Sequence, residues 1–177
     1  MTSRKVFTNW GLTWGGLLDN RKGEWWLIAQ ISLIIGHLIP SWPKDLLNLH
    51  WLNIIIETLG LIIILYGIYL ATNSLLSLGD SLSPLPSPKE GSKLITNNQY
   101  KYCRHPIYKS ILIISTGVVF TTVSILHLTL LLSLCIVLKG KARREERLLK
   151  NRYPEYINYM KKTNAIISKI SYLNWKD

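Results

Sequence analysis

The sequence YKYCRHPIY at residues 100–108 decides the fold, because it stands where a long apolar segment begins. It places three tyrosines, a histidine and an arginine shortly before residues 111–138, which are predominantly apolar. Hydrogen-bonding side chains at the point where a chain enters a membrane are poorly explained by packing alone. A second polar cluster, RREER at residues 143–147, ends the apolar segment and precedes YPEYINY at residues 153–159. We therefore expect the two clusters to meet at one membrane surface and to form a binding site there.

The overall composition fits a small membrane protein. The chain has 177 residues, enough for one domain, and 48% of them are hydrophobic, yet its formal net charge is +11. The lysines and arginines flank apolar runs instead of forming one basic stripe, so we expect no nucleic-acid partner. Cys103 and Cys135 are far apart and have no partners at metal-site spacing, which predicts no metal site.

The apolar runs predict an all-α polytopic membrane protein with about four transmembrane helices. The predicted spans are residues 25–40, 51–72, 107–121 and 124–140. The first is short against the ~20 residues that a crossing needs. Residues 107–138 are too many for one straight crossing at ~1.5 Å per residue, so we divide them at the polar, β-branched sequence TTVS, residues 121–124.

The segments around the spans have their own signals. Residues 1–23 place tryptophans on one apolar face beside cations, which predicts an N-terminal helix lying in the membrane interface. Residues 79–106 form a long loop, because the prolines at 84, 86 and 88 exclude a helix interior, and the apolar sequence LIT at residues 94–96 indicates that this loop is ordered. A second interfacial helix is predicted near the C-terminus from helical spacing of Ile166, Ile167, Ile170 and Leu173.

Charge bias predicts the orientation of the chain. Of the 21 lysines and arginines, only Lys44 falls in a loop that four crossings would place outside. Loops rich in Lys and Arg stay in the cytoplasm. We therefore expect an integral membrane protein whose two termini, loop 79–106 and tail 141–177 are cytoplasmic.

Glu57 lies within the second predicted span. An ionisable side chain inside a membrane is a functional hypothesis by default, and structural pairing with another helix is an equally open explanation.

Four motifs together resemble the isoprenylcysteine carboxyl methyltransferase family, which is related to the membrane phospholipid N-methyltransferases. They are LIT at 94–96, YxYxRHPxY at 100–108, EERLL at 145–149 and YPEY at 153–156. The resemblance covers roughly residues 78–167 and implies a single methyltransferase-like membrane domain over residues 1–177. It also implies S-adenosyl-L-methionine as cofactor and a lipid or prenylated substrate that arrives from the bilayer. Carboxyl O-methylation of a prenylated cysteine or isoprenoid-like acid is the first expectation, and phospholipid N-methylation is the alternative.

The resemblance also assigns residues. It implies that Arg104 lies beside the reacting group, with Lys141 or Arg143 near the substrate head. The implied cofactor-binding residues are Lys93, Leu94, Ile95, Tyr100, His105, Pro106, Ile107, Tyr108, Glu145 and Glu146. The chemistry is suitable, because carboxylates can hold the cofactor's ammonium or ribose hydroxyls and aromatic faces can hold its sulfonium and adenine.

Interpretations of the two clusters that involve no binding site stay open. Residues 143–147 alone are typical of a solvated helix end, and the tyrosines alone are typical of an interface belt. The chain also departs from the family, with Asn98-Gln99 where a Gly-Pro or Gly-Val pair is usual and Ser110 where glycine is usual. Asparagine accepts φ > 0 better than most residues, whereas Ser110 would narrow the space beside the cofactor or a helix. A non-catalytic membrane protein that retains the scaffold is therefore a further alternative.

Overall fold

The computed structural model describes residues 19–43, 50–89 and 91–176, and regular structure there is helical. The elements are α3 (Glu24–Gly36), α4 (His50–Leu78), η1 (Gly79–Ser81), η2 (Asn98–Lys101), α5 (Pro106–Thr122), α6 (Ile125–Arg152), α7 (Tyr156–Lys162) and η3 (Ser171–Leu173). Within these ranges the β-type pairing is a single isolated bridge between Cys103 and Asn164. The predicted all-α class is confirmed.

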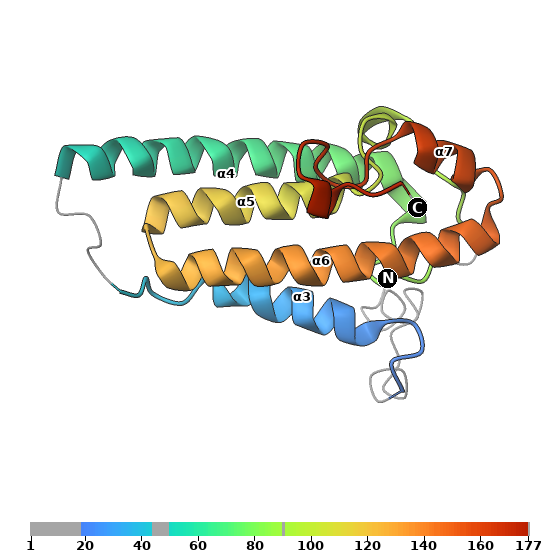
Figure 1. Cartoon of the computed structure of the whole chain (residues 1–177), viewed down its shortest axis with the longest axis horizontal. Coiled ribbons are helices and arrows are strands. Elements are labelled where there is room, and N and C mark those ends of the chain that lie inside the picture. Colours follow the sequence, from blue (N-terminus) through green and yellow to red (C-terminus); the bar gives the residue numbers. More distant parts are fainter. Residues whose placement is uncertain (1–18, 44–49, 90, 177) are drawn as a thin grey trace, which may run out of the picture.

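The long helices lie side by side in the order α4, α5, α6, α3 (Figure 1). Helix α5 packs against both α4 and α6, and α3 packs on the other side of α6. The loop between α4 and α5, helix α7 and the C-terminal segment gather at one end of this bundle (Figure 1). The bundle therefore brings the two polar clusters of the sequence to the same end.

Among the described residues, two helices are long and apolar enough to cross a membrane. They are α4 and α6, while α3 and α5 are shorter apolar helices that coincide with the first and third predicted spans. Large apolar side chains such as Ile55, Ile62 and Leu65 on α4 are more than half exposed. Such a surface is rare on soluble monomers and suits lipid contact. The chain is thus a membrane protein, and the number of four crossings stays a prediction.

The predicted division at residues 121–124 is confirmed. Helix α5 ends at Thr122, and Val123 takes a left-handed conformation with φ 42° that ends the helical path. Ser124 then bonds the backbone of Trp42 twice: its Oγ accepts from the Trp42 N–H at 3.0 Å and donates to the Trp42 carbonyl at 2.8 Å. These bonds fasten the α5–α6 connection to the chain that follows α3. Helix α6 continues to Arg152, beyond the fourth predicted span.

Helices α4 and α5 approach closely where each carries a glycine. A Cβ built on Gly60 would lie 2.7 Å from the Gly117 carbonyl oxygen, and one built on Gly117 would lie 2.7 Å from the Gly60 carbonyl oxygen. Small residues allow backbones of membrane helices to meet in this way. The glycine pair therefore sets the distance between α4 and α5.

The prediction of an interfacial C-terminal helix is wrong. Ile166 and Leu173 are 1% and 2% exposed and belong to the core formed with α5 and α6, whereas only Ile170 of the predicted face is exposed. The Ile166 N–H donates to the Leu173 carbonyl, and Asn174 Oδ1 accepts from the Ala165 N–H, so the segment folds back on itself. Its apolar side chains are buried by packing against the bundle and not by lipid. The predicted N-terminal interfacial helix falls largely on residues 1–18, outside the described residues.

Candidate functional site

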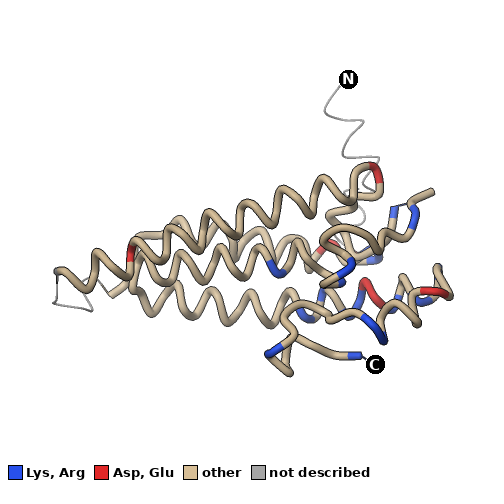
Figure 2. The backbone as a smooth tube through the Cα atoms, turned by 90° about the horizontal axis from the view of Figure 1, so that it is seen from above, with Lys and Arg blue, Asp and Glu red and all other residues tan. Residues whose placement is uncertain are grey.

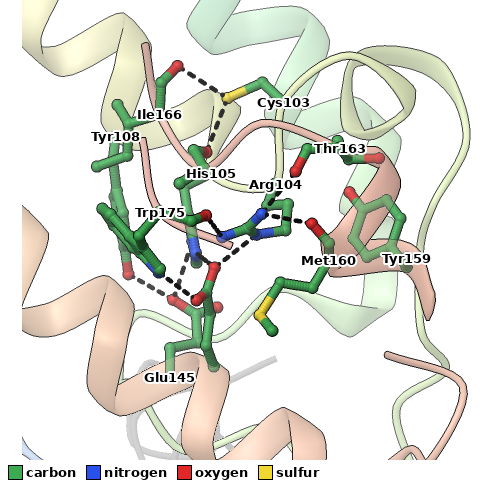
Figure 3. Close-up of polar contacts among 12 residues, drawn as sticks. Cys103, Arg104, His105, Tyr108, Glu145, Tyr159, Met160, Thr163, Ile166 and Trp175 are labelled. Atoms are coloured by element: carbon green, nitrogen blue, oxygen red, sulfur yellow. Dashed lines mark hydrogen bonds and ion pairs between the residues drawn. The ribbon is translucent and has the colours of Figure 1, made fainter. Parts of the chain in front are cut away.

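Arg104 ties the entrance of α5 to the rest of the site. Its side chain is fully buried, and Nε donates a 2.7 Å hydrogen bond to Glu146 Oε1. Nη1 donates to the carbonyls of Met160 and Thr163 at the end of α7, and Nη2 donates to the carbonyl of Trp175 (Figure 3). An arginine side chain has five N–H donors, and these four bonds use four of them. Arg104 therefore holds α6, α7 and the C-terminal segment together.

Glu146 is the acceptor at the centre of this network. Besides Arg104, its Oε1 lies 2.9 Å from His105 Nε2, and its Oε2 accepts a 2.5 Å bond from Trp175 Nε1. The side chain is only 3% exposed. A buried carboxylate is tolerated when it is paired and hydrogen-bonded, as it is here. Glu146 does not line the cavity described below, so these three partners give it a structural role that holds α5, α6 and the C-terminal segment together.

The adjacent acid, Glu145, has a different environment. Its side chain is 29% exposed, and its Oε2 accepts a 2.8 Å hydrogen bond from Tyr108 Oη. The His105 ring stacks on the Tyr108 ring with centroids 5.3 Å apart, and His105 Nδ1 lies 3.7 Å from Glu145 Oε2. The start of α5 is thus in direct contact with the second half of α6, which confirms the expected meeting of the two clusters (Figure 3).

A cavity of about 300 Å³ lies beside these residues. Of the residues expected to bind a cofactor, it is lined by Lys93, Leu94, Ile95, Tyr100, His105, Ile107, Tyr108 and Glu145. Arg104 and Lys141 line it too, whereas Pro106, Glu146 and Arg143 do not. Pro106 is the first residue of α5, a position that suits proline because a backbone N–H there would have no partner in the helix. Arg143 is exposed, with its guanidinium 5.5 Å from the centre of the Trp175 ring.

Lys141 places a buried cation in the cavity wall. Its Nζ donates to Gln30 Oε1 on α3 at 2.7 Å and to the carbonyl of Pro84 in the long loop at 2.8 Å. It also lies 5.3 Å from the centre of the Tyr108 ring. An ammonium has three N–H donors, and these two bonds use two of them. Lys141 therefore joins three parts of the wall, and within the described part of the chain one N–H donor remains for a further acceptor.

Sequence reasoning missed several residues of the site. Tyr153, Tyr156 and Tyr159 line the cavity, and the spacing of three between them in YPEYINY is the signal that would have found them. The Tyr156 hydroxyl is buried without a hydrogen-bond partner among the described residues. Burial raises the pKa of Tyr100, Tyr156 and Tyr159, so these phenols stay protonated. Gln30 and Trp175 have no comparable signal.

Both departures from the family pattern are accommodated. Asn98 has φ 50°, the left-handed conformation that the sequence predicted it to tolerate. Ser110 is buried and donates a 2.7 Å hydrogen bond to the Ile107 carbonyl within α5. Since Ser110 does not line the cavity, its hydroxyl takes no space there.

Comparison with known proteins places these features in a family. Residues 55–156 match the phospholipid methyltransferase family, a stretch that runs from α4 to the first residue of α7 and includes both polar clusters. The chain belongs to this family. The resemblance to membrane methyltransferases is thereby confirmed, and the family is one of methyltransferase-type membrane enzymes. Helix α3 and the segment that carries Trp175 lie outside the residues that match the family.

Two relatives extend the similarity over most of the chain. One is the cobalt-zinc-cadmium resistance protein CzcN of Cupriavidus metallidurans, 29% identical over 160 residues, which cover 88% of this chain and 67% of the relative. The other is the nickel-cobalt-cadmium resistance protein NccN of Alcaligenes xylosoxydans xylosoxydans, 27% identical over 159 residues, with 88% and 68% covered. The similarity to these proteins therefore extends beyond the family match.

Proposed function

We propose that this protein is an S-adenosylmethionine-dependent methyltransferase that acts on an amphiphile in the membrane. The reaction we propose is carboxyl O-methylation of a prenylated cysteine or an isoprenoid-like acid. One observation carries the proposal: Glu145, paired with Tyr108 and His105, shares a cavity with the buried cation of Lys141. Membership of a methyltransferase family supports it.

The cavity suits the proposed cofactor. The buried Tyr156 hydroxyl has no partner among the described residues, and Tyr108 occupies only one oxygen of Glu145. These groups would hold the ammonium or ribose hydroxyls of S-adenosylmethionine, and the Tyr100 ring offers an aromatic face. Once bound, this cofactor supplies an electrophilic methyl group on a sulfonium.

The acceptor side of the cavity suits a carboxylate on an apolar chain. The remaining N–H of Lys141 can hold one carboxylate oxygen, while Leu27 of α3 and Leu75 and Leu78 of α4 provide an apolar wall. A carboxylate nucleophile needs no general base. The protein then acts mainly by alignment, which can supply about 7–11 kcal/mol.

For Arg104 we propose a structural role in place of the catalytic one that the resemblance implies. Its hydrogen bonds to Glu146 and to backbone carbonyls hold His105 and the entrance of α5 in place. We therefore propose Arg104 as a positioning residue and leave the exposed Arg143 out of the site.

Phospholipid N-methylation is the second candidate, and the family description favours it. An amine must lose its proton before it can attack, and the Lys141 ammonium would repel a cationic headgroup. In carboxyl methylation Lys141 would hold the substrate, whereas in phospholipid N-methylation it would oppose binding of the headgroup.

Labelled product analysis tests the proposal. Purified protein in lipid nanodiscs is incubated with methyl-labelled S-adenosylmethionine and with lipid extract or a prenylated acid. A base-labile methyl ester is expected, whereas a stable methylamine would favour the second candidate. Lys141→Met should lower kcat/KM for the acid about 10-fold or more, as loss of a charged hydrogen bond does, while Lys150→Met on the same helix should not. If neither product forms and a labelled cofactor analogue does not bind, the chain is a non-catalytic scaffold.

A further inference from the structure

A second hollow adjoins η2, and no proposed role uses it. It measures about 610 Å³ and is lined by Asn73, Leu76 and Ser77 of α4 together with Asn98, Gln99, Lys101 and Tyr102. Tyr100 lines the cavity described above, whereas its neighbours Gln99 and Lys101 line this hollow. The single turn η2 therefore separates this hollow from the cavity described above.

The lining of this hollow suits an anion. It contains three amide side chains and the Lys101 ammonium, and no carboxylate is among the described residues that line it. The Ser77 hydroxyl also lines it but already donates to the Asn73 carbonyl. The Asn73 amide donates one N–H to the Tyr69 carbonyl, and among the described residues its second N–H remains for another acceptor. A phosphate group has several acceptor oxygens and a negative charge, so it can use these donors together with the cation.

The surroundings of the hollow indicate that the phosphate belongs to a lipid. Leu76 and Tyr102 in its wall are 74% and 71% exposed, and the apolar surface of α4 continues from there through Tyr69 and Leu65. An aromatic side chain and a cation at the edge of an apolar surface are typical of the membrane interface. Acyl chains can therefore lie along α4 while the phosphate occupies the hollow.

The distribution of charge over the whole molecule also supports an anionic lipid as the ligand. Figure 2 shows that Lys and Arg gather toward the end of the bundle that carries the C-terminus. A basic end of this kind is attracted to a leaflet that contains anionic lipid. We propose that the hollow beside η2 is a binding site for the phosphate of an anionic phospholipid. This proposal does not depend on the methyl-transfer reaction.

Lipid preference of the full chain tests the site. The wild-type protein is titrated with short-chain phosphatidylglycerol or phosphatidylcholine, and bound lipid is counted by native mass spectrometry. We expect phosphatidylglycerol to bind about 5-fold more tightly, the effect of one lysine near a membrane surface. Lys101→Gln should remove this preference. Lys161→Gln, an exposed lysine of α7 that does not line the hollow, should leave it intact.

Three results would overturn the proposal. Equal losses in Lys101→Gln and Lys161→Gln would show that the preference comes from diffuse surface charge. Inorganic phosphate or glycerol 3-phosphate binding as tightly as the lipid would show that the acyl chains are not recognised. If Lys101→Gln does not elute as a folded monomer, Gln99→Leu replaces it, and an unchanged lipid preference in that variant would exclude the hollow. Binding of a cofactor analogue, measured on the same samples, tests the methyltransferase proposal separately.

Discussion

Two adjacent glutamates have different environments because of helix geometry. Successive residues on an α-helix are rotated by ~100°, so Glu145 lines the cavity while Glu146 meets Arg104, His105 and Trp175. A carboxylate that is buried away from the cavity and hydrogen-bonded to three side chains stabilises the fold, whereas one that lines the cavity can bind a ligand. The two side chains can therefore be tested separately.

Glu146→Gln should destabilise the protein, because it leaves the buried Arg104 guanidinium without its counter-charge. Breaking a buried ion pair from one side costs about 3–5 kcal/mol. The matched variant Glu145→Gln should change stability by less than about 1 kcal/mol, because the glutamine oxygen can still accept the Tyr108 hydrogen bond, but should weaken binding of a cofactor analogue about 10-fold or more. Chemical denaturation and calorimetric titration measure the two effects. Equal stability of both variants would contradict the distinction.

At the scale of elements, the contact between α4 and α5 depends on residues without side chains. The Gly60 and Gly117 backbones meet where any Cβ would come within 3 Å of a carbonyl oxygen. Apolar side chains cannot hold these helices together by the hydrophobic effect where lipid surrounds them, so close backbone packing must do so. This contact also sets where the end of α4 stands relative to the cavity.

Gly117→Ala should therefore destabilise the folded protein by about 1–3 kcal/mol, the usual effect of overpacking. Its Cβ would lie 2.6 Å from Ile64 Cγ1 as well as 2.7 Å from the Gly60 oxygen. Thr58→Ala, at an exposed position two residues before Gly60, is the control and should have little effect. Denaturation in detergent, followed by the loss of the monomer peak, measures both. An unchanged Gly117→Ala protein would show that α4 can move away without cost.

At the scale of the whole molecule, charge and apolar surface are separated along the bundle. The described lysines and arginines gather toward the end with the site (Figure 2). Large exposed apolar side chains lie on α3 and α4. With the positive-inside bias, this separation predicts that the site end faces the cytoplasm.

Cysteine labelling tests that orientation. In a chain whose Cys103 and Cys135 are alanine, Lys161→Cys places a thiol at the site end and Trp42→Cys places one beyond the other end of α3. An impermeant reagent should label Trp42→Cys in intact cells and Lys161→Cys only in inverted vesicles, because a crossing separates them. Labelling of both from the same side would exclude the predicted topology.

Composition and periodicity by themselves determined the helical class, the break at residues 121–124 and the end of the bundle where the site lies. These properties are local, since apolar run length, prolines and flanking charges act through neighbouring residues. Asn98 belongs to the same group, because its backbone conformation follows from its own side chain.

Only the tertiary structure decided which glutamate lines the cavity and how the C-terminal segment ends. The helical spacing of Ile166, Ile170 and Leu173 fitted an interfacial helix, but burial against α5 and α6 bent the segment back instead. Trp175 reaches Glu146, and Gln30 reaches Lys141 across 111 residues of chain. Contacts of this kind depend on which surfaces are packed together, and no pattern within a single segment carries that information.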